Sequence, residues 1–296
     1  MTIIQTYELT KYYGKGRGIE DLDLEIRSGE IFGFLGPNGA GKTTTIRLLL
    51  DLIRPTRGRA GIFGLDVRAC SLEIRQRVGY LPGVVSLYEN LSGEEFLGLI
   101  DKLHHNRSGK RKDELAERLD IDLSRKIRTY SKGMKQKVAI IQALMNDPEL
   151  LILDEPTSGL DPLVQREFYN LLKEGKERGK TVFLSSHILP EVERVCDRVG
   201  ILRDGLLVAV ENVDDLKTKR VRKLELTMRE DVQQDKLKIP GTKLLYYRNR
   251  HAELEVYIHV GEILRKLAEL PLEDIVFPEA TLEDTFIKYY DEEASL

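Results

Sequence analysis

The chain has 296 residues, of which 41% are hydrophobic and 32% are charged. This length exceeds one domain of ordinary size, and the hydrophobic fraction supports a folded core rather than a disordered chain. The charges nearly cancel, with 46 Lys and Arg against 49 Asp and Glu, which argues against a polycationic nucleic-acid-binding protein. We therefore expect two folded domains and no nucleic-acid partner.

The two cysteines, Cys70 and Cys196, lie far apart and match no metal-ligand spacing. They predict neither a disulfide framework nor a zinc site. The longest apolar runs, such as residues 150–153, fall far short of the ~20 residues that cross a bilayer. The first nine residues lack the pattern of a signal peptide. The sequence therefore predicts an intracellular protein that acts on a membrane only through a partner.

The first half of the chain begins in the manner of a β-α-β unit. Leu22, Leu24 and Ile26 alternate with charged residues, which predicts a strand with one exposed face. Ile31–Leu35 is continuously apolar, as in a strand buried on both faces, and residues 43–53 show helical spacing after a glycine-rich loop. Three further buried strands are expected at the apolar runs 78–81, 150–153 and 181–185.

A helical segment interrupts these strands. Ser92 and Glu95 have the spacing of a capping box, and apolar residues at helical spacing follow them. We expect an inserted helical lobe at about residues 84–146. Further along, Asp204-Gly205 predicts the tight turn of a hairpin.

The character of the sequence changes after Asn212. Three alternating apolar runs and one helical pattern predict a small α+β module there, at residues 223–228, 243–247, 254–258 and 261–270. We place the domain boundary near residue 218, which gives a first domain of residues 1–217 and an accessory domain of residues 218–296.

Residues 36–43 read Gly-Pro-Asn-Gly-Ala-Gly-Lys-Thr, the pattern of a phosphate-binding loop. The glycines allow backbone N–H groups and the N-terminus of the next helix to face a polyphosphate. Lys42 supplies a cation, and the Thr43 hydroxyl can ligate Mg²⁺. A glycine-rich surface loop is the alternative, but the position between a strand and a helix favours the phosphate site. The expected ATP-binding residues of this segment are Gly36, Pro37, Asn38, Gly39, Ala40, Gly41, Lys42, Thr43 and Thr44.

The apolar run 150–153 ends in two carboxylates, Asp154 and Glu155. A phosphoryl-transfer site needs one acid that holds Mg²⁺ and one group that positions the nucleophile. Consecutive side chains of a strand point to opposite sides, so each acid can take one role. A strand that ends in a solvated acidic turn is the alternative, which the phosphate loop makes the weaker one. The sequence thus predicts an Mg-dependent nucleoside triphosphatase with Asp154 as metal ligand and Glu155 as base.

Two later segments resemble motifs of the ABC-transporter ATPases. Residues 130–134, Tyr-Ser-Lys-Gly-Met, resemble the signature motif of that family, although Lys132 and Met134 depart from its commonest form. Residues 158–161, Ser-Gly-Leu-Asp, resemble its D-loop, which ends here in Asp161.

Two single residues complete the resemblance. His187 resembles the switch histidine, which implies a catalytic role near the γ-phosphate. Tyr13 resembles the aromatic residue that stacks on adenine, with Tyr12 as an alternative. Where the family usually has a glutamine that helps order Mg²⁺ and the attacking water, this chain has Gly83. Either a water or another side chain substitutes, or coupling to the membrane subunit runs differently.

The resemblance implies an α/β phosphate-loop NTPase fold with a mixed sheet, flanking helices and an antiparallel β subdomain. It also implies a homodimer in which each ATP lies between one phosphate loop and the partner's Ser131, Lys132 and Gly133. The implied partners are transmembrane permease subunits, which would hold the protein at the cytoplasmic face of the membrane. Residues 81–83, 87–91 and 281–286 resemble the bacterial drug- and antibiotic-export branch, so we expect an exporter.

Two alternatives remain at this point. The first is a soluble ABC-type ATPase with a mechanical or regulatory role, although the chain has one cassette and no sustained heptads before its signature. The second is a phosphate-loop kinase, which explains the loop but not the signature.

Overall fold

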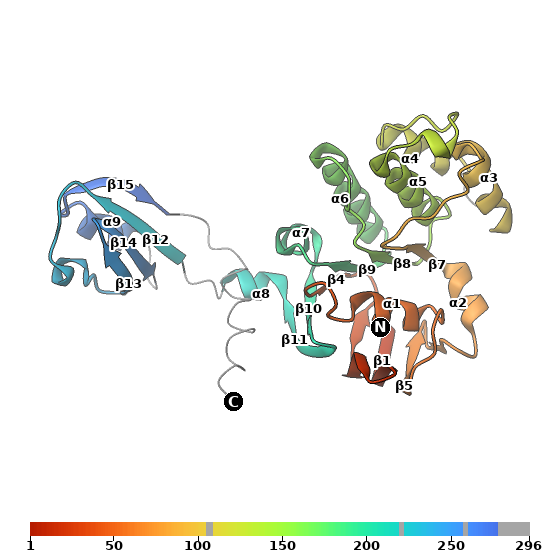
Figure 1. The fold of residues 1–296 in the computed structure, drawn as a ribbon, viewed down its shortest axis with the longest axis horizontal. Coiled ribbons are helices and arrows are strands. Elements are labelled where there is room, and N and C mark those ends of the chain that lie inside the picture. The colour runs from red at the N-terminus through yellow and green to blue at the C-terminus, as the bar shows by residue number, and fades with distance from the viewer. Residues whose placement is uncertain (105–108, 219–221, 257–259, 278–296) are drawn as a thin grey trace. The chain divides into compact units, whose positions relative to one another are not determined.

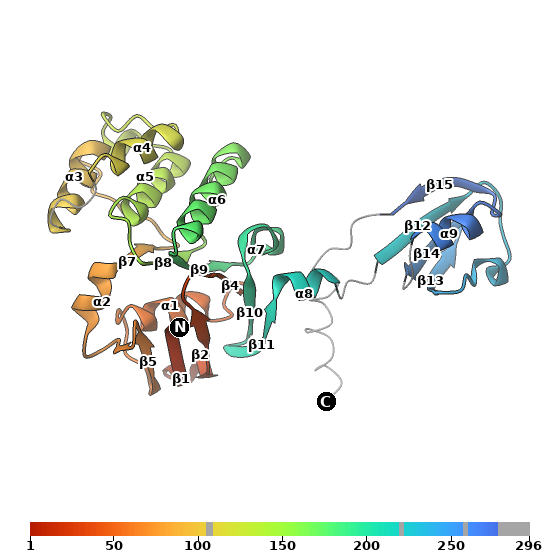
Figure 2. The same ribbon diagram turned by 180° about the vertical axis from the view of Figure 1, so that it is seen from behind.

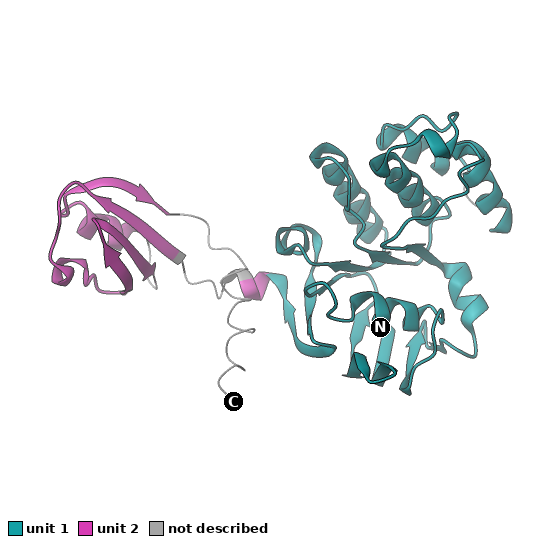
Figure 3. Ribbon diagram, in the orientation of Figure 1, with its two compact units in different colours: residues 1–213 teal, residues 214–296 magenta. Residues whose placement is uncertain are grey.

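A computed structural model describes residues 1–104, 109–218, 222–256 and 260–277. The chain divides into two compact units, residues 1–213 and 214–296 (Figure 3). The sequence-based boundary near residue 218 coincides with the last residue of helix α8 (Val213–Thr218). Within the described residues, no helix is long and apolar enough to cross a membrane.

The first unit is built on a six-stranded sheet with the order β11-β10-β4-β9-β8-β7. All neighbours are parallel except β11, which pairs antiparallel with β10. The strands are β4 (Ile31–Leu35), β7 (Val78–Leu81), β8 (Leu150–Asp154), β9 (Thr181–Ser186), β10 (Arg198–Arg203) and β11 (Leu206–Asn212). Every residue of β4, β8 and β9 is buried, as their continuous apolar runs predict.

A second, antiparallel sheet contains β1 (Thr2–Tyr13), β2 (Gly16–Leu22), β3 (Glu25–Arg27), β5 (Arg57–Ile62) and β6 (Leu65–Asp66). The prediction of one strand through Leu22, Leu24 and Ile26 is wrong, because β2 ends at Leu22 and β3 starts at Glu25. The Thr6 hydroxyl lies at the break: it donates to Leu22 O (2.7 Å) and accepts from Leu24 N (2.9 Å), while Thr6 N donates to Leu24 O (2.9 Å).

The helices of this unit are α1 (Lys42–Leu49), α2 (Ser71–Arg77), α3 (Gly93–Leu103), α4 (Arg111–Arg118), α5 (Lys132–Leu144), α6 (Pro162–Glu177) and α7 (Leu189–Val195). The predicted helix 43–53 is too long, because Asp51 has φ 55° and ends the helical backbone. Figures 1 and 2 show α3, α4 and α5 together, on the opposite side of the parallel sheet from β1 and β5.

The second unit contains a four-stranded antiparallel sheet with the order β13-β14-β12-β15. Its elements are α8, β12 (Arg222–Met228), the 3-10 helix Gln234–Leu237, β13 (Thr242–Arg248), β14 (His251–Val256), α9 (Val260–Leu267) and β15 (Leu272–Val276). Sequence reasoning missed β15, whose residues are mostly exposed and lack a regular apolar alternation. The segment 281–286 lies outside the described residues.

Candidate active site

The phosphate loop follows β4 and leads into α1, where the parallel strands present their carboxyl ends. Gly41 has φ 111°, and a Cβ atom there would lie 2.5 Å from Gly18 O. A Cβ atom at Gly36 would lie 2.3 Å from Leu202 O. Only glycine fits these two positions, so the loop sequence follows from close backbone approach as well as from ligand binding.

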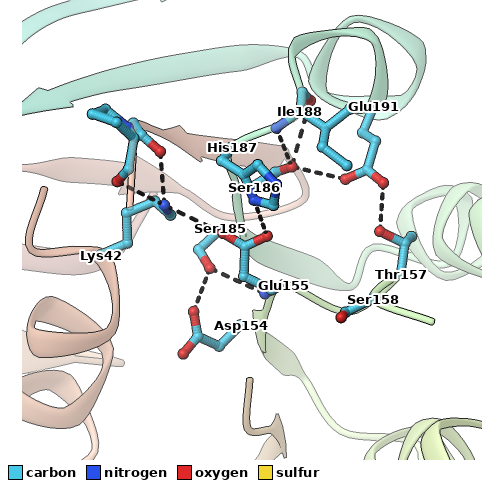
Figure 4. Close-up of polar contacts among 12 residues, drawn as sticks. Lys42, Asp154, Glu155, Thr157, Ser158, Ser185, Ser186, His187, Ile188 and Glu191 are labelled. Carbon is cyan, nitrogen blue, oxygen red and sulfur yellow. Dashed lines mark hydrogen bonds and ion pairs between the residues drawn. The ribbon is translucent and has the colours of Figure 1, made fainter. Parts of the chain in front are cut away.

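Lys42 is buried, with 6% of its surface exposed, and its side chain turns back over the loop. Its Nζ donates to Gly36 O at 2.7 Å and to Pro37 O at 3.2 Å (Figure 4). The same Nζ lies 3.2 Å from Oε1 of Glu155. Two carbonyl groups of the phosphate loop therefore hold the Lys42 ammonium group in place.

Asp154 ends β8 and is almost fully buried. Its Oδ2 accepts a hydrogen bond from the Thr43 hydroxyl at 2.8 Å, and its Oδ1 accepts one from the Ser185 hydroxyl at 2.6 Å. A hydroxyl and a carboxylate in contact are the oxygen donors that Mg²⁺ prefers when phosphates complete its shell. The residues present therefore fit a magnesium ion bound with a nucleotide.

Glu155 follows Asp154 with φ 49°, a left-handed conformation that is uncommon for a residue with a side chain. Its backbone N–H bonds to the carbonyl and the hydroxyl oxygens of Ser185, at 3.2 Å each. Its Oε2 lies 2.6 Å from Nδ1 of His187, which follows β9. The Glu155 carboxylate thus lies between Lys42 and His187.

Gly83 follows β7 and lies against Asp154. A Cβ atom there would be 3.0 Å from Oδ2 and 3.2 Å from Cγ of Asp154. The position of the family's glutamine is therefore next to Asp154, but a side chain there needs a shift of a few tenths of an ångström.

The two tyrosines differ in their surroundings. Tyr12 donates to Glu20 at 2.6 Å, and this hydrogen bond raises the pKa of the Tyr12 hydroxyl. Tyr13 is half exposed, and a Cβ atom on Gly18 would lie 2.9 Å from its ring and 3.2 Å from the Thr44 methyl group. The Tyr13 ring is thus close to the start of α1 and half exposed, with Lys11 Nζ 5.4 Å from its centroid, whereas the Tyr12 hydroxyl is bonded to Glu20.

The signature residues contact the turn after Glu155. Ser131 caps α5 by accepting from Met134 N at 3.2 Å, and Lys132 Nζ donates to the Ser158 hydroxyl at 3.2 Å. A Cβ atom at Gly133 would lie 2.8 Å from Gly159 O, so the two loops touch through their backbones.

Asp161 caps α6 through the backbone N–H groups of Leu163 and Val164, which lower the pKa of its carboxyl. The structure thus brings Lys42, Thr43, Asp154, Glu155 and His187 into one hydrogen-bonded site. It connects Lys132 and Gly133 to the D-loop segment instead, and Ser131 caps α5.

Sequence reasoning missed Ser185. Its hydroxyl donates to the Asp154 carboxylate, and its hydroxyl and carbonyl oxygens accept from the backbone N–H of Glu155. The available signal was a small polar residue at the end of a buried strand. It also missed the buried carboxylate of Glu191, for which no motif was evident.

Comparisons with known proteins agree with this geometry. Residues 19–158 match the family model described as ABC transporter. The bacitracin transport ATP-binding protein of Bacillus licheniformis is 39% identical over 297 residues, which cover 97% of both chains.

Two solved structures are also similar. The structure of an ATP-binding subunit of an ABC transporter has a TM-score of 0.69 and 34% identity, and the match covers 74% of this chain and 93% of that one. A dimeric ATP-binding cassette in a post-hydrolysis state with ADP and Pi has a TM-score of 0.65 and 25% identity, over 71% and 99% of the two chains. This chain belongs to the ABC transporter family, as one of its ATP-binding proteins.

Proposed function

We propose that the chain binds and hydrolyses Mg-ATP to power a membrane exporter. The observation that carries this proposal is the direct hydrogen bond between Thr43 of the phosphate loop and Asp154 of β8, with Glu155 and His187 beside it. The family supports ATP as the substrate, and the donor set of Thr43 and Asp154 supports magnesium as its companion ion.

Each residue has a defined role in this proposal. Lys42 and the amides of residues 36–44 bind the phosphates, and Tyr13 stacks on the adenine. Thr43 and Asp154 hold Mg²⁺, which when bound neutralises charge on the phosphates. Glu155 polarises the attacking water as general base, and His187 orients the Glu155 carboxylate while facing the γ-phosphate.

The second half of each site comes from another copy of the chain. In this arrangement Ser131, Lys132 and Gly133 contact the ATP held by the partner's phosphate loop, and Asp161 lies in the D-loop beside them. The similarity to a dimeric cassette supports it. ATP then joins the two chains, and hydrolysis allows them to separate, which converts chemistry into motion.

The transported substrate is proposed from the relatives. The Bacillus licheniformis protein is named for bacitracin transport, so we propose export of a peptide antibiotic or a similar amphipathic drug. The chain would act at the cytoplasmic face of the membrane on transmembrane permease subunits, with the helical lobe near residues 91–103 as docking surface. Residues 1–217 would form the ATPase domain and residues 218–296 an accessory α+β domain.

Two measurements test this function. Phosphate release from Mg-ATP by the purified chain, and its loss in Asp154→Asn, test the hydrolytic site. Co-purification of the full chain with an integral membrane protein from detergent-solubilised membranes tests the transporter. Hydrolysis with no membrane partner would instead favour a mechanical or regulatory ATPase.

A further inference from the structure

Glu191 of α7 has a buried carboxylate that the mechanism above does not use. It is 7% exposed. Its Oε1 accepts a hydrogen bond from the Thr157 hydroxyl, and its Oε2 accepts one from the Ser186 hydroxyl at 2.8 Å (Figure 4). Thr157 and Ser186 are themselves buried, so this network is closed to solvent.

The two hydroxyl partners belong to the two segments that carry the proposed chemistry. Thr157 is the second residue after Glu155, and Ser186 directly precedes His187. Glu191 therefore connects the end of β8 to the end of β9, at the point where Glu155 Oε2 and His187 Nδ1 lie 2.6 Å apart.

Each oxygen of the Glu191 carboxylate accepts a hydrogen bond. A carboxylate removed from water is costly unless donors satisfy its oxygens, and here two hydroxyls do so. The Tyr169 hydroxyl lies beside them, and burial together with the charge of Glu191 raises the pKa of Tyr169. Loss of the carboxylate would leave the Thr157 hydroxyl without this acceptor and the Ser186 hydroxyl with only the Ile188 carbonyl at 3.4 Å, so we expect the segments that bear them to shift.

Glu155 needs such support. Its φ of 49° is unfavourable for a residue with a side chain and persists only where neighbouring contacts hold it. The turn that follows contains a hydrogen bond from Ser158 N to Glu155 O at 3.2 Å, and Thr157 lies inside this turn. The hydrogen bond from Thr157 to Glu191 fixes this turn to α7.

We propose that Glu191 is a positioning residue, which fixes Glu155 against His187 by binding Thr157 and Ser186. This proposal rests on the proposed role of Glu155 in hydrolysis. Misplacement of a reacting group by about 1 Å can cost on the order of 100-fold in rate. Loss of Glu191 should therefore lower kcat and leave nucleotide affinity unchanged, because the phosphate loop bonds to this network through the backbone alone. Gly36 N donates to Ser186 O at 3.3 Å, and this bond does not use the Glu191 carboxylate.

The test uses the full-length chain with Glu191→Ala, Thr157→Val and Thr157→Ser. We expect Glu191→Ala and Thr157→Val to lower kcat by about tenfold or more, with an unchanged KM for Mg-ATP and unchanged affinity for a non-hydrolysable ATP analogue. Thr157→Ser keeps the hydroxyl and should retain nearly full kcat. Glu177→Ala, an exposed carboxylate in the last turn of α6, is the matched control and should be unaffected.

A double variant separates positioning from general destabilisation. If Thr157→Val and Glu191→Ala break the same link, their losses in kcat should not multiply. If Glu191→Ala does not fold, the pair Thr157→Val and Thr157→Ser decides. Equal losses in these two, or a lower melting temperature with normal kcat per folded molecule, would overturn the positioning role. Normal kcat in Glu191→Ala beside an inactive Glu155→Gln refutes this proposal alone, whereas an active Glu155→Gln refutes the proposed function.

Discussion

Lys42 and Glu155 form an ion pair, with 3.2 Å between Nζ and Oε1. Lys42 is 6% exposed and the Glu155 side chain 22%, so water screens this contact only weakly. Among the described residues Oε1 accepts no hydrogen bond of good geometry, so its contact with Lys42 is mainly one of charge. The phosphates of ATP and the proposed base therefore compete for one cation, and nucleotide binding should free the Glu155 carboxylate to face water.

Lys42→Ala removes this cation from both partners. We expect affinity for Mg-ATP to fall by about tenfold or more, since a hydrogen bond from a charged donor contributes about 1.5–3 kcal/mol. Isothermal titration measures the change directly, with Lys173→Ala as a control because Lys173 is exposed on α6. Wild-type affinity in Lys42→Ala would remove this residue from the site.

Gly83→Gln would restore the family's glutamine, but the structure predicts lower hydrolysis. Its Cβ atom would press on Asp154, which Thr43 and Ser185 already hold from two sides. Overpacking of this kind costs about 1–3 kcal/mol, so we expect a several-fold fall in phosphate release. Gly83→Ala separates the effect of the Cβ atom from that of the rest of the glutamine side chain. It adds only the Cβ atom and should show the same fall. Unchanged or higher rates would show that the loop moves aside.

The sequence predicted those parts of the site that depend on local patterns. The phosphate loop could be read because its glycines, lysine and threonine form a motif of eight consecutive residues, and the acids because they end an apolar strand. Ser185, Thr157 and Glu191 could not be read, because their importance comes from contacts between segments that are far apart in the sequence.

In the fold, too, local patterns could be predicted and contacts between distant segments could not. The fully buried strands β4, β8 and β9 and the hairpin at Asp204-Gly205 follow from local composition, and Asp204 and Gly205 have φ of 47° and 82° as a type I′ turn requires. The break between β2 and β3 lies at the Thr6 hydroxyl, which bonds to backbone groups from another strand. The alternation of apolar residues does not predict such a contact.

The capping box of α3 gives a prediction for stability. Two hydrogen bonds lower the pKa of the Glu95 carboxyl from 4.5 to about 2. The backbone N–H of Ser92 contributes most, and the Lys126 side chain contributes next. Charged Glu95 therefore stabilises the folded state above about pH 4.5, and this contribution is lost as the pH falls toward 2.

Glu95→Gln should consequently lower the free energy of unfolding at neutral pH and have a smaller effect at about pH 3.5. Urea unfolding at the two pH values measures the difference, with Glu177→Gln as a control for loss of an exposed charge. An equal effect at both pH values would contradict the assigned cause.

A chain that ends after Thr218 should still bind ATP. It keeps every residue assigned to the nucleotide, and the site residues described above all lie in the first unit. Titration with Mg-ATP should give the affinity of the full chain, with circular dichroism as a check of folding. A folded but non-binding fragment would show that the second unit supports the site.

Glu155→Gln tests the mechanism itself. The amide keeps the shape of the side chain and a contact to His187, but it loses the charge that polarises water. Hydrolysis should fall by on the order of 100-fold or more, as expected for a lost general base. Affinity for ATP should rise above that of the wild type, because the phosphates no longer compete with a carboxylate for Lys42.

The same variant reports on the dimer. If ATP joins two chains and hydrolysis releases them, Glu155→Gln should accumulate as a dimer with Mg-ATP and remain a monomer without it. Light scattering coupled to size-exclusion chromatography measures both states. Lys42→Ala/Glu155→Gln is the matched control, since it lacks the cation and should not dimerise. Normal hydrolysis in Glu155→Gln would refute the base, whereas an inactive monomer with ATP bound would retain the base and count against ATP as the link between two free chains.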